Sequence, residues 1–483
     1  MPLYDVVVKH GTLVIPYTGT VRADIGVIHG RIAAMSEEIA AGESELVLDA
    51  KGKWVFPGAV DSHYHVGIYR PLSDDAETES ASSTVGGVTT IISYFRTGQH
   101  YLNKSGPYHD IFPEVLQLSR GHFYTDYGYH IAIMTSQQLD EVDMLVEQYG
   151  VGSFKFYMFY KGLNLTADST RGRDYTMADN YDLGHLYQLM ERVARTAAKH
   201  KDAGRIALSL HCENPELIRV FIDEVKASGL KGLEAYSKAR PPLTERLSIH
   251  EAAVLADATR CPINLLHLSS QLALEAGIET RRQYPHLDIQ LETTLHHLAL
   301  TYDMAGGVKG KVNPPIRAQK DADALWNGLL HGDLDTVVSD HACCFEEHKR
   351  ENDLWGSLPG FGGSSLLYPV LLSEGFHRRR LSLTRIAELL AANPARNFGL
   401  YPRKGTLVVG ADADLAIVDL EKRQRVTPDL LKSAQDFTPF DGMTLTGWPV
   451  QTILRGQVVF SGGRLVNKPP VGEYLKRPIG LHP

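Results

Sequence analysis

The chain has 483 residues, of which 43% are hydrophobic and 22% are charged, a composition typical of a soluble globular protein. Its net charge of −8 and its isoelectric point near 6.2 argue against nucleic acid or an anionic membrane surface as a partner, because both attract positive charge. No window approaches the ~20 consecutive apolar residues of a membrane span. The first residues, MPLYDVVVKHGTLVIP, lack the basic start and apolar core of a secretory signal. We therefore expect a cytoplasmic protein whose four cysteines are free thiols.

The predicted elements change in kind twice along the chain. Residues 1–55 contain short β-patterned runs, VVVKHGTLVI, ADIGVIHGRIAAM and ELVLDAKGKWVF, separated by glycines and charged turns. In residues 56–400, strand-like runs alternate with stretches of helical period such as HLYQLMERVARTAAKHK and PELIRVFIDEVKAS. The predicted strands are Gly58–His63, Val88–Phe95, Tyr129–Met134, Ser153–Met158, Ile206–His211, Ile263–His267, Asp288–Thr293 and Thr336–Asp340. Residues 401–483 return to a β pattern, with KGTLVVGADADLAIVDL and VQTILRGQVVFSGGRLV.

Eight alternations of strand and helix predict an α/β fold, a closed (β/α)8 TIM barrel rather than an open sheet. Such a barrel takes ~250 residues or more. We therefore assign residues 56–400 to the barrel. The β-patterned ends, residues 1–55 and 401–483, would most simply combine into one small β-sandwich beside it.

The pair His63-Tyr64-His65 follows FPGAVD, at the expected mouth of the first barrel strand. Side chains alternate along a strand, so both imidazoles lie on one face, the geometry for two ligands on one ion. With 21 histidines in the chain, such a pair also arises by chance or on the surface. Its place at a strand end favours a site.

Lys155 lies in the aromatic run SFKFYMFYK, where burial of a charged amine is costly without a partner or a modification. An ion pair or a solvent-directed amine is the simpler local interpretation. The alternative is an amine carboxylated by carbon dioxide, an anion whose two oxygens can bridge two cations. The other candidate ligands favour this alternative.

His211 in LSLHCEN and His267 in NLLHLSS each end an apolar run. A single histidine there is more often a hydrogen-bonded core residue, but two on consecutive barrel strands indicate a site. Asp340 ends the last predicted strand in VVSDHACC. A carboxylate beside a metal-activated water can accept its proton and deliver it to a leaving nitrogen, so Asp340 is the expected general base and acid.

In order along the chain, FPGAVDSHYH, SFKFYMFYK, HCEN, HLSS, VNPPIR and SDH resemble motifs of the amidohydrolase superfamily. The resemblance is to its cyclic amidohydrolases: dihydropyrimidinases, hydantoinases, allantoinases and dihydroorotases. It covers nearly the whole chain, since the terminal β segments also match the family's sandwich. The resemblance implies hydrolysis of a small cyclic amide or imide, and a homo-oligomer, a tetramer or a dimer.

The resemblance also implies a centre of two divalent metal ions, usually Zn²⁺. His63 and His65 would hold the more buried ion with Asp340, His211 and His267 would hold the other, and carboxylated Lys155 would bridge them. A hydroxide shared by the two ions would attack the ring carbonyl.

Further residues gain roles from the resemblance alone. Tyr160, five residues after the lysine, would hydrogen-bond the developing oxyanion. Asn313 in VNPPIR would contact the ring imide, together with backbone groups near Thr293 and Thr294.

The sequence departs from the family pattern near the expected substrate. Dihydroorotases carry an arginine two positions after the second histidine, where this chain has Gly67; Arg70 or Arg96 could supply a cation instead. Tyr157 and Asn164 replace apolar residues of hydantoinases. A polar stretch over residues 163–182 extends the chain between Lys155 and His211, as either a substrate lid or a solvated insertion.

Several functions remain open. The first is a ring hydrolase of dihydropyrimidinase or hydantoinase type, with allantoinase-like, dihydroorotase-like and linear amide hydrolases as alternatives. The second is a non-catalytic scaffold, like the collapsin response mediator proteins. The intact ligand set favours an enzyme, and metal analysis separates the two, because a scaffold needs no metal ions.

Overall fold

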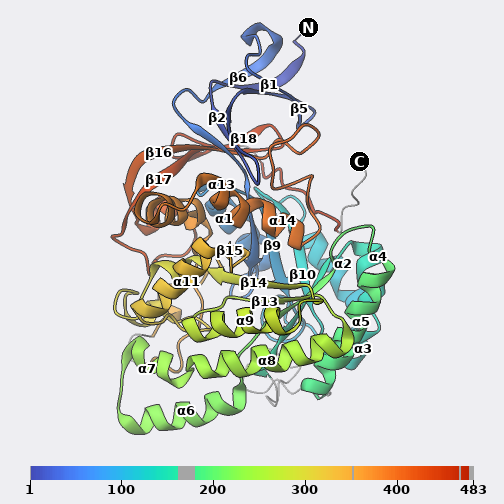
Figure 1. The fold of residues 1–483 in the computed structure, drawn as a ribbon, viewed down its shortest axis with the longest axis vertical. Helices are drawn as coiled ribbons and strands as arrows, with labels where there is room; N and C mark the ends of the chain where they lie inside the picture. Colours follow the sequence, from blue (N-terminus) through green and yellow to red (C-terminus); the bar gives the residue numbers. More distant parts are fainter. Residues whose placement is uncertain (1, 161–179, 351–352, 467–468, 478–483) are drawn as a thin grey trace.

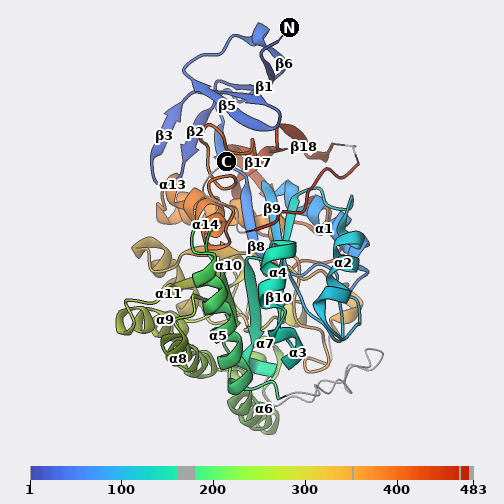
Figure 2. The same ribbon diagram turned by 90° about the vertical axis from the view of Figure 1, so that its right-hand side faces the viewer.

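Two terminal β-sheets and a parallel barrel organise the chain in the computed structural model, which describes residues 2–160, 180–350, 353–466 and 469–477 (Figure 1). The terminal sheets lie at one end, in blue and red, and the barrel with its helices occupies the rest (Figures 1 and 2). The fold is thus an α/β barrel flanked by β-sheets formed from the two ends of the chain, as the sequence predicts.

The barrel strands pair in chain order, each parallel to the next. They are β8 (Ala59–Tyr64), β9 (Val88–Phe95), β10 (Asp126–Ala132), β11 (Ser153–Tyr157), β12 (Ala207–His211), β13 (Ile263–Leu265), β14 (Ile289–Thr294) and β15 (Thr336–Val338). The segment after β15 meets β8 through a parallel bridge between Tyr64 and His341, and the Ser339 amide donates to Asp61 Oδ1 at 3.1 Å. These contacts close the barrel.

Helices surround the strands, because the apolar faces of the helices and of the sheet are buried against each other. The helices within the barrel region are α1 (Leu72–Val85), α2 (Tyr108–Ser119), α3 (Ser136–Leu139), α4 (Val142–Tyr149), α5 (Leu183–Lys199), α6 (Pro215–Ser228), α7 (Gly232–Ala239), α8 (Pro242–Thr259), α9 (Gln271–Gln283), α10 (Leu295–Ala299), α11 (Gln319–His331), α12 (Leu367–Val370), α13 (Leu383–Ala387) and α14 (Asn393–Asn397). In α5, Leu186, Leu189, Met190 and Val193 recur at helical spacing and are buried. The Asp182 side chain caps this helix by accepting from the His185 amide.

The terminal sheets combine both ends of the chain. One sheet has the order β5 (Arg31–Ser36), β4 (Asp24–Ile28), β1 (Tyr4–Lys9) and β6 (Ser44–Asp49). The other has the order β19 (Arg464–Leu465), β18 (Gln457–Ser461), β17 (Thr444–Leu454), β16 (Leu415–Arg425), β7 (Trp54–Pro57), β2 (Thr12–Ile15) and β3 (Gly19–Arg22). Their shared core joins Val8 and Leu13 from the first part of the chain to Ile417 and Ile453 from the last. The short helix α15 (Pro428–Leu431) connects β16 to β17.

The eight predicted strands are present, with corrected ends. β10 begins at Asp126 rather than Tyr129, because Asp126 pairs with Thr90 of β9 and its buried carboxylate binds Lys404. β13 and β15 end before His267 and Asp340, whose backbones have φ of 37° and 50°. This left-handed conformation stops the extended ladder, so the two residues lie in the loops that follow the strands.

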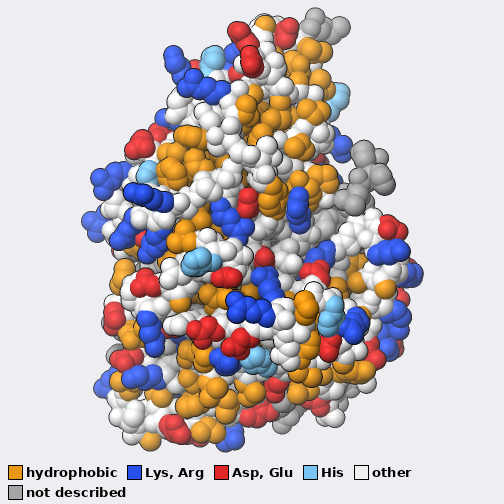
Figure 3. Space-filling view, viewed as in Figure 1, with side chains coloured by type: hydrophobic (Ala, Val, Ile, Leu, Met, Phe, Trp, Pro, Cys, Tyr) orange, Lys and Arg blue, Asp and Glu red, His pale blue; other side chains and the backbone are white. Residues whose placement is uncertain are grey.

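The surface in Figure 3 carries Lys and Arg interspersed with Asp and Glu. Hydrophobic side chains are also visible over the terminal sheets in this view. Within these sheets, Val21, Leu46 and Val47 are exposed. In the described residues, none of the helices is sufficiently long and apolar to cross a membrane. The four cysteines are buried free thiols, as expected.

Candidate metal centre

The six predicted ligand positions converge at the C-terminal ends of the barrel strands. Lys155 lies in the middle of β11, whereas His267 and Asp340 follow β13 and β15 by two residues. Each of the six is at most 9% exposed: His63, His65, Lys155, His211, His267 and Asp340. The fold therefore gathers donors from distant parts of the chain into one buried place.

The first cluster consists of His63, His65 and Asp340, whose potential ligand atoms all lie within 4.8 Å of one another. The Nε2 atoms of both histidines are 3.1 Å from Asp340 Oδ1. Their opposite nitrogens are engaged elsewhere, since His63 Nδ1 is 2.7 Å from Glu292 Oε1 and His65 Nδ1 is 2.8 Å from the Tyr101 hydroxyl. These outer contacts orient both rings with Nε2 toward Asp340.

The second cluster consists of His211 and His267, with His211 Nδ1 2.9 Å from His267 Nε2. On its other side, His211 Nε2 is 2.6 Å from Glu213 Oε2. Because a carboxylate only accepts, this contact favours the tautomer with hydrogen on Nε2 and a free lone pair on Nδ1. The rings of His63 and His267 are 5.3 Å apart between centroids, so the two clusters adjoin.

Lys155 Nζ is fully buried and has no hydrogen-bond partner among the described residues. It lies 4.2 Å from the Tyr94 ring centroid and 4.8 Å from that of Tyr157. Burial lowers the pKa of Lys155 to about 7, although Asp340 and Glu292 oppose the shift. A neutral amine is the form that carbon dioxide carboxylates, so this environment fits the expected carbamate.

The four histidines are held neutral, as metal ligands must be. Burial, reinforced by the Lys155 charge and neighbouring imidazoles, holds the pKa values of His63 and His267 well below the usual range. Burial also lowers the pKa of His65, and lowers that of His211 to about 4. Nitrogen lone pairs, one aspartate and a modifiable lysine form a donor set that could hold two divalent cations.

Three supporting residues escaped the sequence analysis. Glu292 holds His63 and also accepts from the His267 amide at 3.2 Å, while burial raises its pKa well above the usual range. Tyr101 holds His65, and Glu213 holds His211. Only Glu213 carried a local signal, as the third residue of HCEN. Glu292 is 229 positions from its partner His63.

A cavity of about 340 Å³ opens onto the cluster. Its lining includes His65, His211 and Asp340 together with Tyr160 and Asn313. The volume lies within the ~300–1,000 Å³ range of small-molecule sites. The structure thus brings the expected oxyanion donor and the expected ring contact to the same space as the ligands.

Thr293 and Thr294 are fully buried at the end of β14, and neither lines this cavity. The Thr293 hydroxyl donates to the Leu268 carbonyl oxygen at 2.8 Å, and the Thr294 hydroxyl lies 2.8 Å from His297 Nδ1. Their side chains are occupied internally. The expectation that their backbone groups contact substrate stays a prediction.

Arg70 and Arg96, the two residues that could supply a cation in place of the arginine missing at Gly67, have different environments. Arg70 Nη1 is 3.1 Å from Asp75 Oδ1 and 2.8 Å from the Thr78 hydroxyl, so Arg70 stabilises the loop after β8. Arg96 lines the cavity and lies 5.5 Å from the Tyr160 ring centroid. Asn164 and most of the 163–182 stretch fall outside the described residues.

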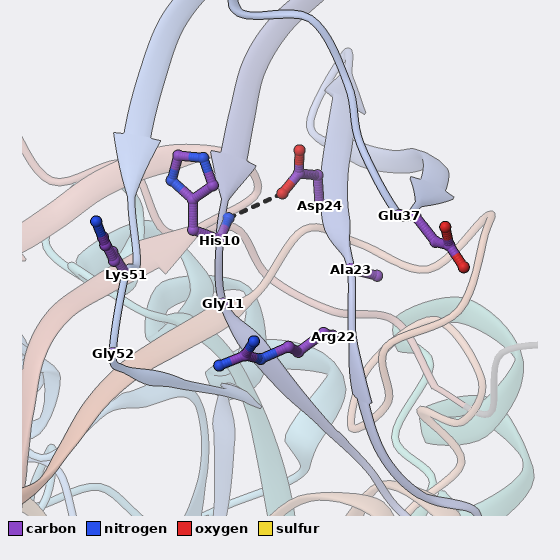
Figure 4. A pocket seen from close by; sticks show the side chains of 8 residues that line it. All are labelled: His10, Gly11, Arg22, Ala23, Asp24, Glu37, Lys51 and Gly52. Carbon is purple, nitrogen blue, oxygen red and sulfur yellow. Dashed lines mark hydrogen bonds between the residues drawn. The ribbon is translucent and has the colours of Figure 1, made fainter.

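A second cavity, also of about 340 Å³, lies in the N-terminal sheets (Figure 4). The His10 amide donates to Asp24 Oδ1 there at 2.8 Å, and Arg22, Glu37 and Lys51 stand around the opening. None of the predicted site residues lines it. The metal-ligand cluster therefore belongs to the barrel cavity.

Several known proteins resemble this chain in sequence and in structure. The sequence profile of the Amidohydrolase family matches residues 181–459. A D-hydantoinase of Ralstonia pickettii is 30% identical over 98% of this chain and 99% of its own length. An allantoinase of Deinococcus radiodurans is 32% identical over 96% of this chain and 97% of its own length. The solved L-hydantoinase (dihydropyrimidinase) from Arthrobacter aurescens superimposes with a TM-score of 0.86 at 30% identity, covering 98% of this chain and all of that one.

Proposed function

The chain belongs to the amidohydrolase family, and from this premise we propose that it hydrolyses a cyclic amide or imide of dihydropyrimidine or hydantoin type. The observation that carries the proposal is the fully buried Lys155 amine, which has no hydrogen-bond partner among the described residues, beside four neutral histidines and Asp340. Relatives named hydantoinase, dihydropyrimidinase and allantoinase match the chain over nearly its whole length, which supports a cyclic substrate.

In this proposal the donor set holds two divalent ions, with zinc expected. His63, His65 and Asp340 would hold one, His211 and His267 the other, and carboxylated Lys155 would bridge them. When bound, the ions would generate a nucleophile from water at neutral pH and polarise the ring carbonyl. The contacts of Glu292, Tyr101 and Glu213 keep the lone pairs of the histidines directed to the centre.

The protein's own groups then move protons and stabilise charge. Asp340 borders the cavity, where its carboxylate can accept a proton from the nucleophile and deliver it to the leaving ring nitrogen. Tyr160 also borders the cavity, and its hydroxyl can donate to the oxygen that becomes negative during attack. Asn313, with backbone groups near Thr293 and Thr294, would position the ring so that one carbonyl faces the nucleophile.

The cavity wall favours a small or polar ring substituent. Tyr157 stands on this wall where many hydantoinases have a phenylalanine, and its ring centroid is 5.0 Å from that of Tyr160. The Gly67 amide donates to Asp75 Oδ2, and a side chain at Gly67 would meet Leu72 at 3.0 Å, so this position offers no clamp for a substrate carboxylate. Arg96 is the cation on the described part of the wall.

A substrate panel tests the proposal. The purified, zinc-loaded protein is assayed against dihydrouracil, hydantoin, 5-substituted hydantoins, allantoin, dihydroorotate and simple cyclic imides, with Asp340→Asn as the control. We expect ring opening of at least one neutral ring, abolished or greatly reduced in the control. No hydrolysis of any of these rings by a chain holding both metals would contradict it.

A further inference from the structure

A chain of buried polar contacts runs from the metal-ligand cluster to the substrate cavity. Glu213, whose side chain is 2.6 Å from His211, also accepts from Arg240 Nε at 2.9 Å and from Arg240 Nη2 at 2.5 Å. Arg240 is therefore fixed by a two-point contact with Glu213.

Arg240 also lies close to Tyr236, the next residue in this series of contacts. The Arg240 guanidinium carbon is 5.9 Å from the Tyr236 ring centroid, and Lys311 Nζ is 5.0 Å from the same ring. Burial raises the pKa of Tyr236, and Arg240 opposes the rise by facing the hydroxyl oxygen. Since a guanidinium only donates, the Tyr236 hydroxyl oxygen acts as the acceptor toward Arg240, and the hydroxyl hydrogen is left for another acceptor.

That acceptor is Asn313. The Tyr236 hydroxyl donates to Asn313 Oδ1 at 2.6 Å. No described residue accepts a hydrogen bond from Asn313 Nδ2, and Asn313 borders the barrel cavity beside His211 and Asp340. The amide group thus has its oxygen occupied by the protein, while its two N–H donors have no partner in the described part of the chain.

The segment that carries Asn313 is also hydrogen-bonded to the helix that carries Tyr236. Arg317, four residues later in VNPPIR, is 3% exposed. Its Nη1 donates to the carbonyl oxygens of Ser237 at 3.0 Å and Arg240 at 2.6 Å, at the end of α7. α7 and the Asn313 segment are therefore joined at two points, which fixes the Tyr236 hydroxyl relative to the Asn313 amide.

We propose that Tyr236 is a positioning residue that holds the Asn313 side chain with its N–H donors toward the substrate. This inference rests on the proposed function, in which the substrate ring carries a second carbonyl besides the one that is attacked. The second carbonyl is the one not attacked, and it accepts from Asn313 Nδ2. A site built to pair with such an oxygen discriminates against a ring in which the acceptor is missing or weak.

The test compares hydantoin with 2-thiohydantoin, in which the carbonyl that is not attacked becomes a poor sulfur acceptor. Tyr236→Phe removes only the hydroxyl and keeps the ring between Arg240 and Lys311. Tyr284→Phe is the matched control, because its exposed hydroxyl, 3.1 Å from Gln283 Nε2, lies after α9 and outside the cavity lining. Metal content is measured for all three proteins.

We expect Tyr236→Phe to raise KM for hydantoin by roughly three- to tenfold, the range of one neutral hydrogen bond, with kcat within about twofold. The preference for hydantoin over 2-thiohydantoin in kcat/KM should shrink by about the same factor. The reactivity of the two rings cancels in this comparison between proteins. Metal content should not change, and Tyr284→Phe should match the wild type.

An unchanged preference in Tyr236→Phe, with hydantoin still hydrolysed, would overturn the role of Tyr236 and leave the proposed function intact. A fall in kcat with loss of metal would also overturn it, since it would place Tyr236 in support of the ligands alone. No hydrolysis of any ring by the wild type would overturn the proposed function and this inference with it.

Discussion

Replacing Lys155 with methionine should stabilise the metal-free protein while removing its function. The buried amine has a pKa of about 7 instead of the ordinary 10.5. The Lys155 amine therefore binds a proton less strongly in the folded state than in the unfolded chain. This difference lowers the free energy of unfolding whenever the pH is below 10.5. The cost grows by about 1.4 kcal/mol for each pH unit from 10.5 down to 7 and is constant below that.

Lys155→Met keeps a flexible side chain of similar length without the charge. From these values we expect metal-free Lys155→Met to exceed metal-free wild type in unfolding free energy by up to ~4 kcal/mol at pH 7.5. At pH 9.5 the difference should fall to ~1.4 kcal/mol. Urea unfolding of the two chelator-treated proteins at both pH values measures it.

Lys404 supplies the matched control, since it is also fully buried but binds carboxylates. Its Nζ is 2.7 Å from Asp414 Oδ2 and 2.9 Å from Asp412 Oδ2, and it also pairs with Asp126. Lys404→Met leaves these acids without their cation and should destabilise the fold by ~3–5 kcal/mol. If Lys155→Met were also destabilising, or if its effect did not change with pH, the argument for a neutral, modifiable amine would be refuted.

Three further predictions concern the reaction. Lys155→Ala should lose metal and activity together, with partial return of both on adding short-chain carboxylic acids; full metal content and turnover would exclude the bridging role. Asp340→Asn should keep most of its metal by elemental analysis while kcat falls ~10²–10⁴-fold, as for a lost proton-transfer group; near-normal turnover would assign proton transfer to another residue. The kcat/KM for a neutral ring with a small or polar substituent should exceed the kcat/KM for 5-benzylhydantoin, because loss of an apolar wall removes roughly 1–3 kcal/mol of preference per group. It should also exceed the kcat/KM for dihydroorotate. A preference for dihydroorotate would instead identify a carboxylate-binding cation, with Arg96 the first to mutate.

The barrel could be predicted because strand and helix periods are local properties of sequence. Eight apolar runs and the helices between them required no knowledge of distant contacts. The strand ends were harder, since His267 and Asp340 leave the ladder by adopting positive φ, which their flanking residues do not signal. The ligand positions nevertheless emerged, because barrel topology alone brings strand ends together.

The distant partners of the site residues could not be predicted. Glu292 meets His63, and Tyr236 meets Asn313, only after barrel closure and helix packing bring separate segments together. The choice between Arg70 and Arg96 also needed the structure. Both follow barrel strands in sequence, but Arg70 pairs with Asp75 and Glu79, whereas Arg96 borders the cavity.

The most direct test of the central claim is the rate of ring opening measured against the metal content of the protein, as ions are removed by a chelator and returned as zinc. The account predicts about two ions per chain in the active protein, loss of hydrolysis on their removal, and recovery on their return in the presence of bicarbonate. Undiminished ring opening by a chain free of metal would contradict it.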